Sequence, residues 1–158
     1  DFDYTLDLTK RMIQARKESL SQYSKELRKD NPFAEDILDD VSYYTWVELH
    51  YFWHFCLWRL QAIFEGMITQ TFLSHLKNRQ LIGLKSKLDA MKKAGYSIEQ
   101  DLYNEIIEWG KIRNVLSHCP PEQFNPGLLK EEDIKEYLGI IKEVVSVWRR
   151  EEKTIHNT

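Results

Sequence analysis

Apolar residues recur every three to four positions along most of this chain, which is the spacing of one face of an α-helix. Only 6 glycines and 4 prolines interrupt the 158 residues. We therefore predict about five helices, at residues 9–30, 42–78 with a bend near Gly66, 81–94, 98–118 and 130–153. Short links between the later helices favour an all-α antiparallel bundle, which we expect to form a single domain over residues 1–158.

Two helices have clear core faces. The predicted core positions of the first helix are Ile13, Leu20, Tyr23 and Leu27. Those of the last helix are Ile134, Tyr137, Leu138, Ile141, Val144 or Val145, and Trp148. We expect the first helix to end at residues 31–32 (Asn-Pro) and residues 33–40 to form an acidic connector.

The long middle helix carries apolar residues on all sides between Tyr43 and Phe64. It includes the tryptophans Trp46, Trp53 and Trp58. A helix that is apolar all round must be covered all round. We therefore expect the rest of the bundle, or a second subunit, to cover it.

Local signals mark the boundaries of the next two helices. Gly95 is expected to stop the helix over residues 81–94. Ser97 and Gln100 form a capping-box pattern, so the following helix is expected to begin at Ile98.

Composition excludes several classes of protein. A net charge of -3 argues against a dedicated binder of duplex DNA, although it leaves room for a local basic groove. The cysteines, Cys56 and Cys119, have neither the spacing of a metal site nor that of a disulfide framework. We find no signal peptide and no apolar run near the roughly 20 residues that a membrane span needs. These features favour a cytoplasmic protein without a membrane anchor.

Arg113 lies in the apolar stripe of the helix over residues 98–118. The other members of this stripe are Leu102, Ile106, Trp109 and Leu116. Burying an unpaired guanidinium costs several kcal/mol. We therefore expect Arg113 to meet an acid, a subunit interface or an anionic ligand. Glu65 and Glu105 are the acids that would make it a purely structural residue.

His118 follows Arg113 by five residues, and Pro120 and Pro121 come directly afterwards. A proline disfavours the helical conformation of the residue before it, so the helix should end near His118. Imidazole is the side chain best suited to proton transfer near neutral pH. The alternative is a histidine that bonds the last carbonyls of the helix.

Residues 113–118 (RNVLSH) resemble the R-x4-6-H signature of the HEPN superfamily, in which a polar residue, often asparagine, follows the arginine. Asn114 occupies that position. The superfamily is an α-helical bundle with the signature late in the chain, before a final helix, and the predicted helix order is similar. The resemblance covers most of the chain as architecture, but only about six residues as a motif.

This resemblance implies a metal-independent endoribonuclease without a cofactor. Such proteins are often the toxin of a toxin–antitoxin pair or part of an anti-phage system, and they act as dimers with a composite site. Here His118 would be the general base or acid for attack of a ribose 2′-hydroxyl on the adjacent phosphate. Arg113 would neutralise the phosphorane, and Asn114 would orient the phosphate or the histidine. The products would be a 2′,3′-cyclic phosphate and a 5′-hydroxyl. The implied partners are RNA, a second copy of the chain, and an antitoxin or other defence protein.

Helix geometry bears on this assignment. On an ideal helix Arg113 and His118 point about 140° apart. They converge only if the turn before Pro120 unwinds or if a partner subunit brings its own pair. We favour the second option, because it agrees with the composite site of the superfamily.

Other polar residues are weaker candidates. Lys85, Lys92 and Lys93 belong to a basic run that starts at Lys77 and could contact an RNA backbone, or could simply be a solvated helix face. Lys111 and Ser117 are further candidates for substrate binding. His50 and His54 have a spacing that can bind zinc, but no third ligand is evident, so we expect packed or interfacial histidines and no metal site.

Three functions are therefore open from the sequence. The first is the dimeric ribonuclease with Arg113, Asn114 and His118 as its site. The second is a HEPN-like module that binds a nucleotide, RNA or a protein without cleavage. The third is a purely structural helical dimerisation domain.

Overall fold

The computed structural model describes residues 1–74, 81–118 and 129–155. These residues form five α-helices and one short π-helix, and none of them lies in a β-strand. The elements are α1 (Phe2–Asp30), α2 (Ala34–Met67), η1 (Ile68–Phe72), α3 (Leu84–Lys93), α4 (Gln100–His118) and α5 (Glu131–Ile155). The predicted all-α bundle is confirmed. None of the described helices combines the length and apolarity that a membrane crossing requires.

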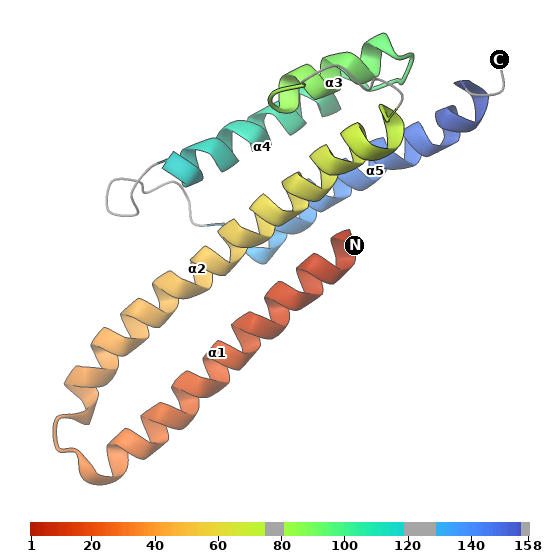
Figure 1. Ribbon diagram of the computed structural model, residues 1–158. Coiled ribbons are helices and arrows are strands. Elements are labelled where there is room, and N and C mark those ends of the chain that lie inside the picture. The colour runs from red at the N-terminus through yellow and green to blue at the C-terminus, as the bar shows by residue number, and fades with distance from the viewer. Residues whose placement is uncertain (75–80, 119–128, 156–158) are drawn as a thin grey trace.

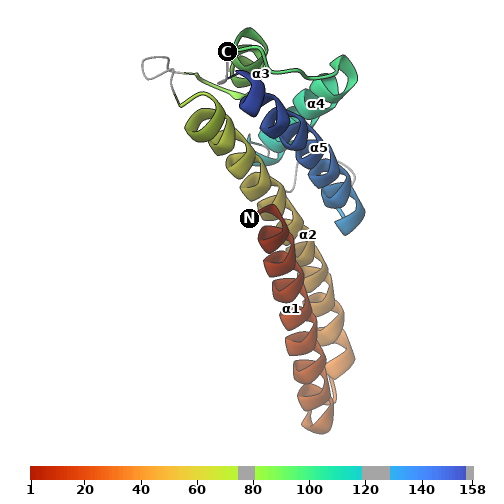
Figure 2. The same cartoon turned by 90° about the vertical axis from the view of Figure 1, so that its right-hand side faces the viewer.

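Helices α1 and α2 form a long antiparallel hairpin whose tip projects beyond the other helices (Figures 1 and 2). Asn31 ends α1 in an extended conformation, as expected for a residue before proline, and its Oδ1 accepts a hydrogen bond of 2.9 Å from the backbone of Phe33. The acidic connector predicted for residues 33–40 is wrong, because α2 begins at Ala34. Its acids Glu35 and Asp36 instead occupy the first turn, where the helix dipole favours them.

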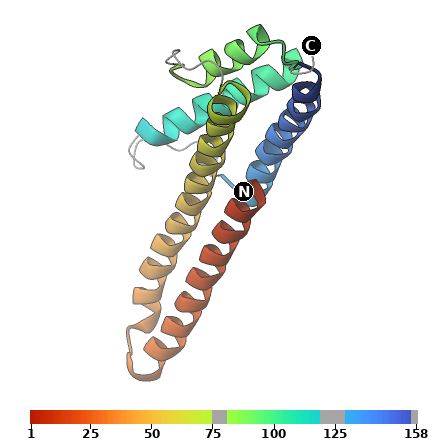
Figure 3. The ribbon, with the colours of Figure 1, turned by 45° about the vertical axis from the view of Figure 1, so that its right-hand side comes forward.

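Helix α1 begins at Phe2, seven residues before the predicted start. Its predicted core face is only partly buried, since Ile13 is 9% exposed whereas Tyr23 is 43% exposed. The reason is that the tip of the hairpin stands clear of α3, α4 and α5 (Figure 2). Near its N-terminus α1 lies beside α5 (Figure 3), where Lys142 bonds Asp3 at 2.5 Å and Lys10 bonds Glu131 at 3.0 Å.

The middle helix breaks close to the predicted position. Helix α2 runs through Gly66 to Met67 and then widens into the single π turn η1. Its body end is buried as predicted, with Leu57, Leu60 and Phe64 fully buried. Toward the tip the chain by itself does not cover every side of α2, and covering by a second subunit stays a prediction. Tyr43, Tyr44 and Trp46 remain exposed there.

Helices α3 and α4 are short and joined by a glycine turn. Gly95 follows α3 with a φ of 93°, a conformation that favours glycine, which confirms it as the stop signal. Helix α4 begins at Gln100 rather than at Ile98. Ser97 does not join α4 because α5 holds its backbone. Its N–H donates to Glu151 at 2.9 Å and its carbonyl accepts from Trp148 Nε1 at 2.8 Å.

The core is centred on Trp148 of α5. This side chain has no exposed surface and stacks on Phe64 with ring centroids 5.8 Å apart. The whole predicted core face of α5 is buried, which confirms the apolar stripe read from the sequence. Its members are Ile134, Tyr137, Leu138, Ile141, Val144, Val145 and Trp148.

Candidate functional site

The described part of helix α4 extends to His118, and its last two turns carry the candidate catalytic residues. The predicted stop at Pro120 and Pro121 lies outside the described residues. One turn earlier, Gly110 is buried against α3, and a Cβ built there would lie 2.9 Å from Leu84 Cδ2. This close approach brings the backbone of α4 near α3. It leaves Arg113, one turn further on, facing α2.

Arg113 is held by two side chains of α2. Its Nη2 lies 3.3 Å from Glu65 Oε1, and its Nε donates to Gln61 Oε1 at 3.4 Å. Glu65 is thus confirmed as an acidic partner of Arg113, whereas Glu105 is exposed on α4. Even so, the Arg113 side chain keeps 34% of its surface exposed. The guanidinium is oriented by α2 without being sealed from a ligand.

Glu65 makes its shorter contact with another cation. Lys87 Nζ of α3 lies 2.5 Å from Glu65 Oε2, and both side chains are largely buried, at 16% and 13% exposed. One carboxylate therefore serves two cations. The sequence placed Lys87 in a basic run but gave no signal that it turns inward, because only the packing of α3 on α2 decides its direction.

These residues line a hollow of about 500 Å³ between α2, α3 and α4, which we term the α4 pocket. Its lining residues are Trp58, Ala62, Glu65, Gly66, Thr69, Lys87, Arg113 and Ser117. The sequence places Trp58 on the aromatic middle helix, and it gives no signal for Thr69. Trp58 shares one side of α2 with Glu65, and Thr69 follows one turn later in η1.

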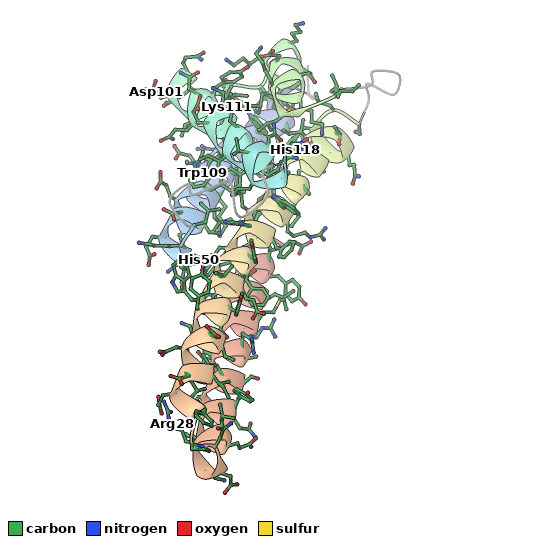
Figure 4. All side chains as sticks on the ribbon, turned by 90° about the vertical axis from the view of Figure 1, so that its left-hand side faces the viewer. Arg28, His50, Asp101, Trp109, Lys111 and His118 are labelled. Carbon is green, nitrogen blue, oxygen red and sulfur yellow. The ribbon has the colours of Figure 1, made fainter. Side chains whose placement is uncertain are left out.

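Asn114 and His118 lie on another side of α4. Both are exposed and sit one turn apart. Figure 4 shows His118 and Trp109 on opposite sides of the helix. Trp109 packs toward α5, with its ring 5.3 Å from that of Tyr137. Because α4 stays regular to His118, Arg113 and His118 diverge within one chain, as the spacing predicts.

The remaining polar candidates do not converge on the α4 pocket, except for Ser117. Its hydroxyl donates to the Arg113 carbonyl at 2.8 Å, which closes the helix end. Lys111 pairs with Glu108 at 2.5 Å, and Lys85 pairs with Asp89 at 2.8 Å.

Two lysines of the basic run lie at the end of α3. Lys92 lies over the Tyr103 ring at 3.9 Å, and Lys93 is exposed. Lys77 lies outside the described residues. In this run Lys85 and Lys87 are therefore paired with acids, whereas Lys92 keeps its charge above an aromatic ring.

The histidine pair of α2 is packed, as predicted. His50 Nδ1 lies 3.2 Å from the Leu129 carbonyl, and its ring meets Trp46 edge-on at 4.7 Å. Burial lowers the pKa of His54, and the neighbouring His50 adds to the effect. Across residues 1–74, 81–118 and 129–155, no group of three or more His, Cys, Asp and Glu side chains could hold a metal ion.

Comparison with known proteins gives this chain no relative. No family model, no curated protein and no solved structure matches it.

Proposed function

We propose that the chain is a metal-independent endoribonuclease of the HEPN type that acts as a homodimer. The observation that carries this proposal is the end of α4. There an oriented and partly exposed guanidinium, Arg113, opens onto a pocket with a second cation, five residues before an exposed imidazole, His118. A permanent cation and a group that titrates near neutrality are what phosphodiester transesterification needs.

In the proposed reaction, His118 of one copy takes the proton from a ribose 2′-hydroxyl. The 2′-oxygen then attacks the adjacent phosphorus. Arg113 of the other copy neutralises the charge that develops on the phosphorane, and Asn114 orients the phosphate or the imidazole. The bond to the 5′-oxygen breaks, that oxygen takes up a proton from solvent, and the products are a 2′,3′-cyclic phosphate and a 5′-hydroxyl.

A second copy is needed because one chain does not bring Arg113 and His118 together. A groove of about 550 Å³ between α1 and α2, which we term the α1–α2 groove, supports the proposal of a second copy. Large side chains stand exposed along it, namely Tyr4, Leu8, Met12 and Phe55 at 62%, 41%, 45% and 58%. The Phe55 ring lies 5.4 Å from that of Trp58, which lines the α4 pocket. A copy seated on this apolar groove would therefore stand next to Arg113.

The cellular setting that we propose is a toxin–antitoxin or anti-phage system, with an antitoxin or other defence protein as partner. A toxic effect of expression that His118→Ala relieves would support this setting. Expression without any effect on growth would count against a toxin.

The first test is cleavage of labelled RNA in EDTA. We expect the protein to cut, with cyclic phosphate ends identified by mass spectrometry, and we expect Arg113→Ala and His118→Ala to reduce cleavage at least about a hundredfold. Lys29→Ala, at the exposed tip of the hairpin in α1, is the control and should cut normally. Cleavage that both active-site variants retain, or that EDTA abolishes, would contradict the proposal.

A complementation experiment tests the composite site. Co-expression of Arg113→Ala and His118→Ala chains gives mixed dimers with one intact site, built from the Arg113 of one chain and the His118 of the other. We expect a substantial part of the activity to return in purified mixed dimers. A site confined to one chain would give no recovery.

The second candidate function is a binding module that does not cleave. It is favoured by the ion pair of Arg113 with Glu65 and by the divergence of Arg113 and His118 within the chain. RNA or nucleotide binding without cleavage by the wild-type dimer would support it.

A further inference from the structure

The α4 pocket has an excess of positive charge. Lys87 and Arg113 face it with Glu65 as their shared carboxylate, so these three groups sum to one positive charge. The largely buried position of Lys87 and Glu65 weakens screening by solvent. The pocket therefore favours an anionic group.

Hydrogen-bond donors near the pocket lack acceptors. Trp58 Nε1 and Gln61 Nε2 are buried atoms without a hydrogen-bond partner in the described part of the chain. Gln61 is 1% exposed, and its Oε1 already accepts from Arg113. An unpaired buried donor is unfavourable by about 1–3 kcal/mol. Of these two donors, Trp58 lines the pocket and Gln61 does not, so an acceptor oxygen of a ligand would satisfy the Trp58 indole N–H.

The α2 wall of the pocket leaves room for a flat group. Apart from Trp58 and Glu65, the residues of α2 that line the pocket are small, namely Ala62 and Gly66. A Cβ built on Gly66 would meet nothing within 4 Å. The indole of Trp58 touches Phe55 edge-on and is itself only partly buried. An aromatic ring of a ligand could therefore stack on it.

We propose that the α4 pocket binds one nucleotide of the RNA substrate, with a phosphate on Lys87 and Arg113 and its base against Trp58. A nucleotide combines the features that the pocket selects, which are negative charge, acceptor oxygens and a flat ring. This inference rests on the proposed function for the identity of the ligand. It adds Trp58 and Lys87 as substrate-binding residues beyond the signature at the end of α4.

The test uses a labelled 2′-O-methyl oligoribonucleotide, which lacks the attacking hydroxyl and cannot be cut, so binding is measured apart from cleavage. We expect Trp58→Ala to weaken binding about tenfold by fluorescence anisotropy, and Trp58→Phe to weaken it less, since phenylalanine still stacks. Trp46→Ala, on the exposed tip half of α2, is the matched control and should bind as the wild type does.

An abasic version of the same oligonucleotide separates stacking from a structural effect. We expect Trp58→Ala and the wild type to bind the abasic probe equally well. Equal weakening on both probes would show that Trp58 only supports the fold, and it would overturn the proposal.

The charge is tested with Lys87→Gln. We expect weaker binding and a shallower dependence on salt concentration, by about one unit of the logarithmic slope. Lys29→Gln, an exposed lysine at the hairpin tip in the last turn of α1, is the control and should bind with the salt dependence of the wild type. Binding that Trp58→Ala and Lys87→Gln both leave unchanged while RNA is still cut would overturn this inference alone. Binding without cleavage would instead overturn the proposed catalysis.

Discussion

At the scale of single residues, Glu65 decides the character of the candidate site. It pairs with Lys87 at 2.5 Å and with Arg113 at 3.3 Å, and it comes from a different helix than either. The carboxylate stabilises two cations that would otherwise repel each other. It also competes with any phosphate that approaches them. Glu65 is therefore a structural counter-ion, and it would compete with the proposed phosphate for the same two cations.

We expect Glu65→Gln to lower the free energy of unfolding by about 1–3 kcal/mol, because two partly buried cations lose their counter-ion. Urea denaturation measures this change. Since the local charge then rises by one, inorganic phosphate should restore stability in the variant more than in the wild type. Equal stabilisation of both proteins by phosphate would show that no anion binds at these cations.

At the scale of elements, the approach of α4 to α3 fixes where Arg113 points. Gly110 allows this approach, because any side chain there would meet Leu84 and come within 3.4 Å of Gln61 Nε2. By contrast Gly139 is exposed on the outer side of α5 and has open space around its Cβ position. The two glycines therefore have different roles in helices of the same fold.

We expect Gly139→Ala to raise the free energy of unfolding by roughly 1 kcal/mol, the ordinary gain for a helix interior. Gly110→Ala should lower it by about 1 kcal/mol, because overpacking against Leu84 outweighs the same gain. Thermal or urea denaturation compares the pair. A stabilising Gly110→Ala would mean that α3 yields easily and does not fix the direction of Arg113.

At the scale of the whole molecule, the exposed apolar residues of α1 and α2 leave a long hairpin incompletely covered. The α1–α2 groove combines Tyr4, Leu8 and Met12 of one helix with Phe55 of the other. It lies next to the α4 pocket through the contact of Phe55 with Trp58. Dimerisation and catalysis are therefore expected to fail together.

We expect Leu8→Glu to weaken self-association at least about tenfold, since a carboxylate would be buried without a partner. Sedimentation analysis measures the change, and RNA cleavage should fall in parallel. Tyr23→Glu, on the exposed outer part of α1, is the control and should change neither self-association nor RNA cleavage. A wild-type protein that stays monomeric at the concentration at which it cuts RNA would contradict the composite site.

The sequence by itself determined the helices and the core of α5, because the spacing of apolar residues such as Ile134, Ile141 and Trp148 records which side must leave water. It determined the divergence of Arg113 and His118, which follows from helical geometry alone. Its errors lie at helix boundaries and in the outer part of α1, where the predicted core residue Tyr23 is exposed. The true starts of α1, α2 and α4 differ from the predicted ones. Ser97 does not cap α4 as expected, because its backbone is hydrogen-bonded to α5.

Only the tertiary structure decided which side chains meet. Glu65, Lys87 and Arg113 are far apart in the chain and come from three helices, so no local pattern encodes their contact. The same holds for the pocket that Trp58 and Thr69 line and for the exposed face of the hairpin tip. The physical reason is that a helical period defines which face a residue occupies, whereas the partner of that face depends on how the helices pack.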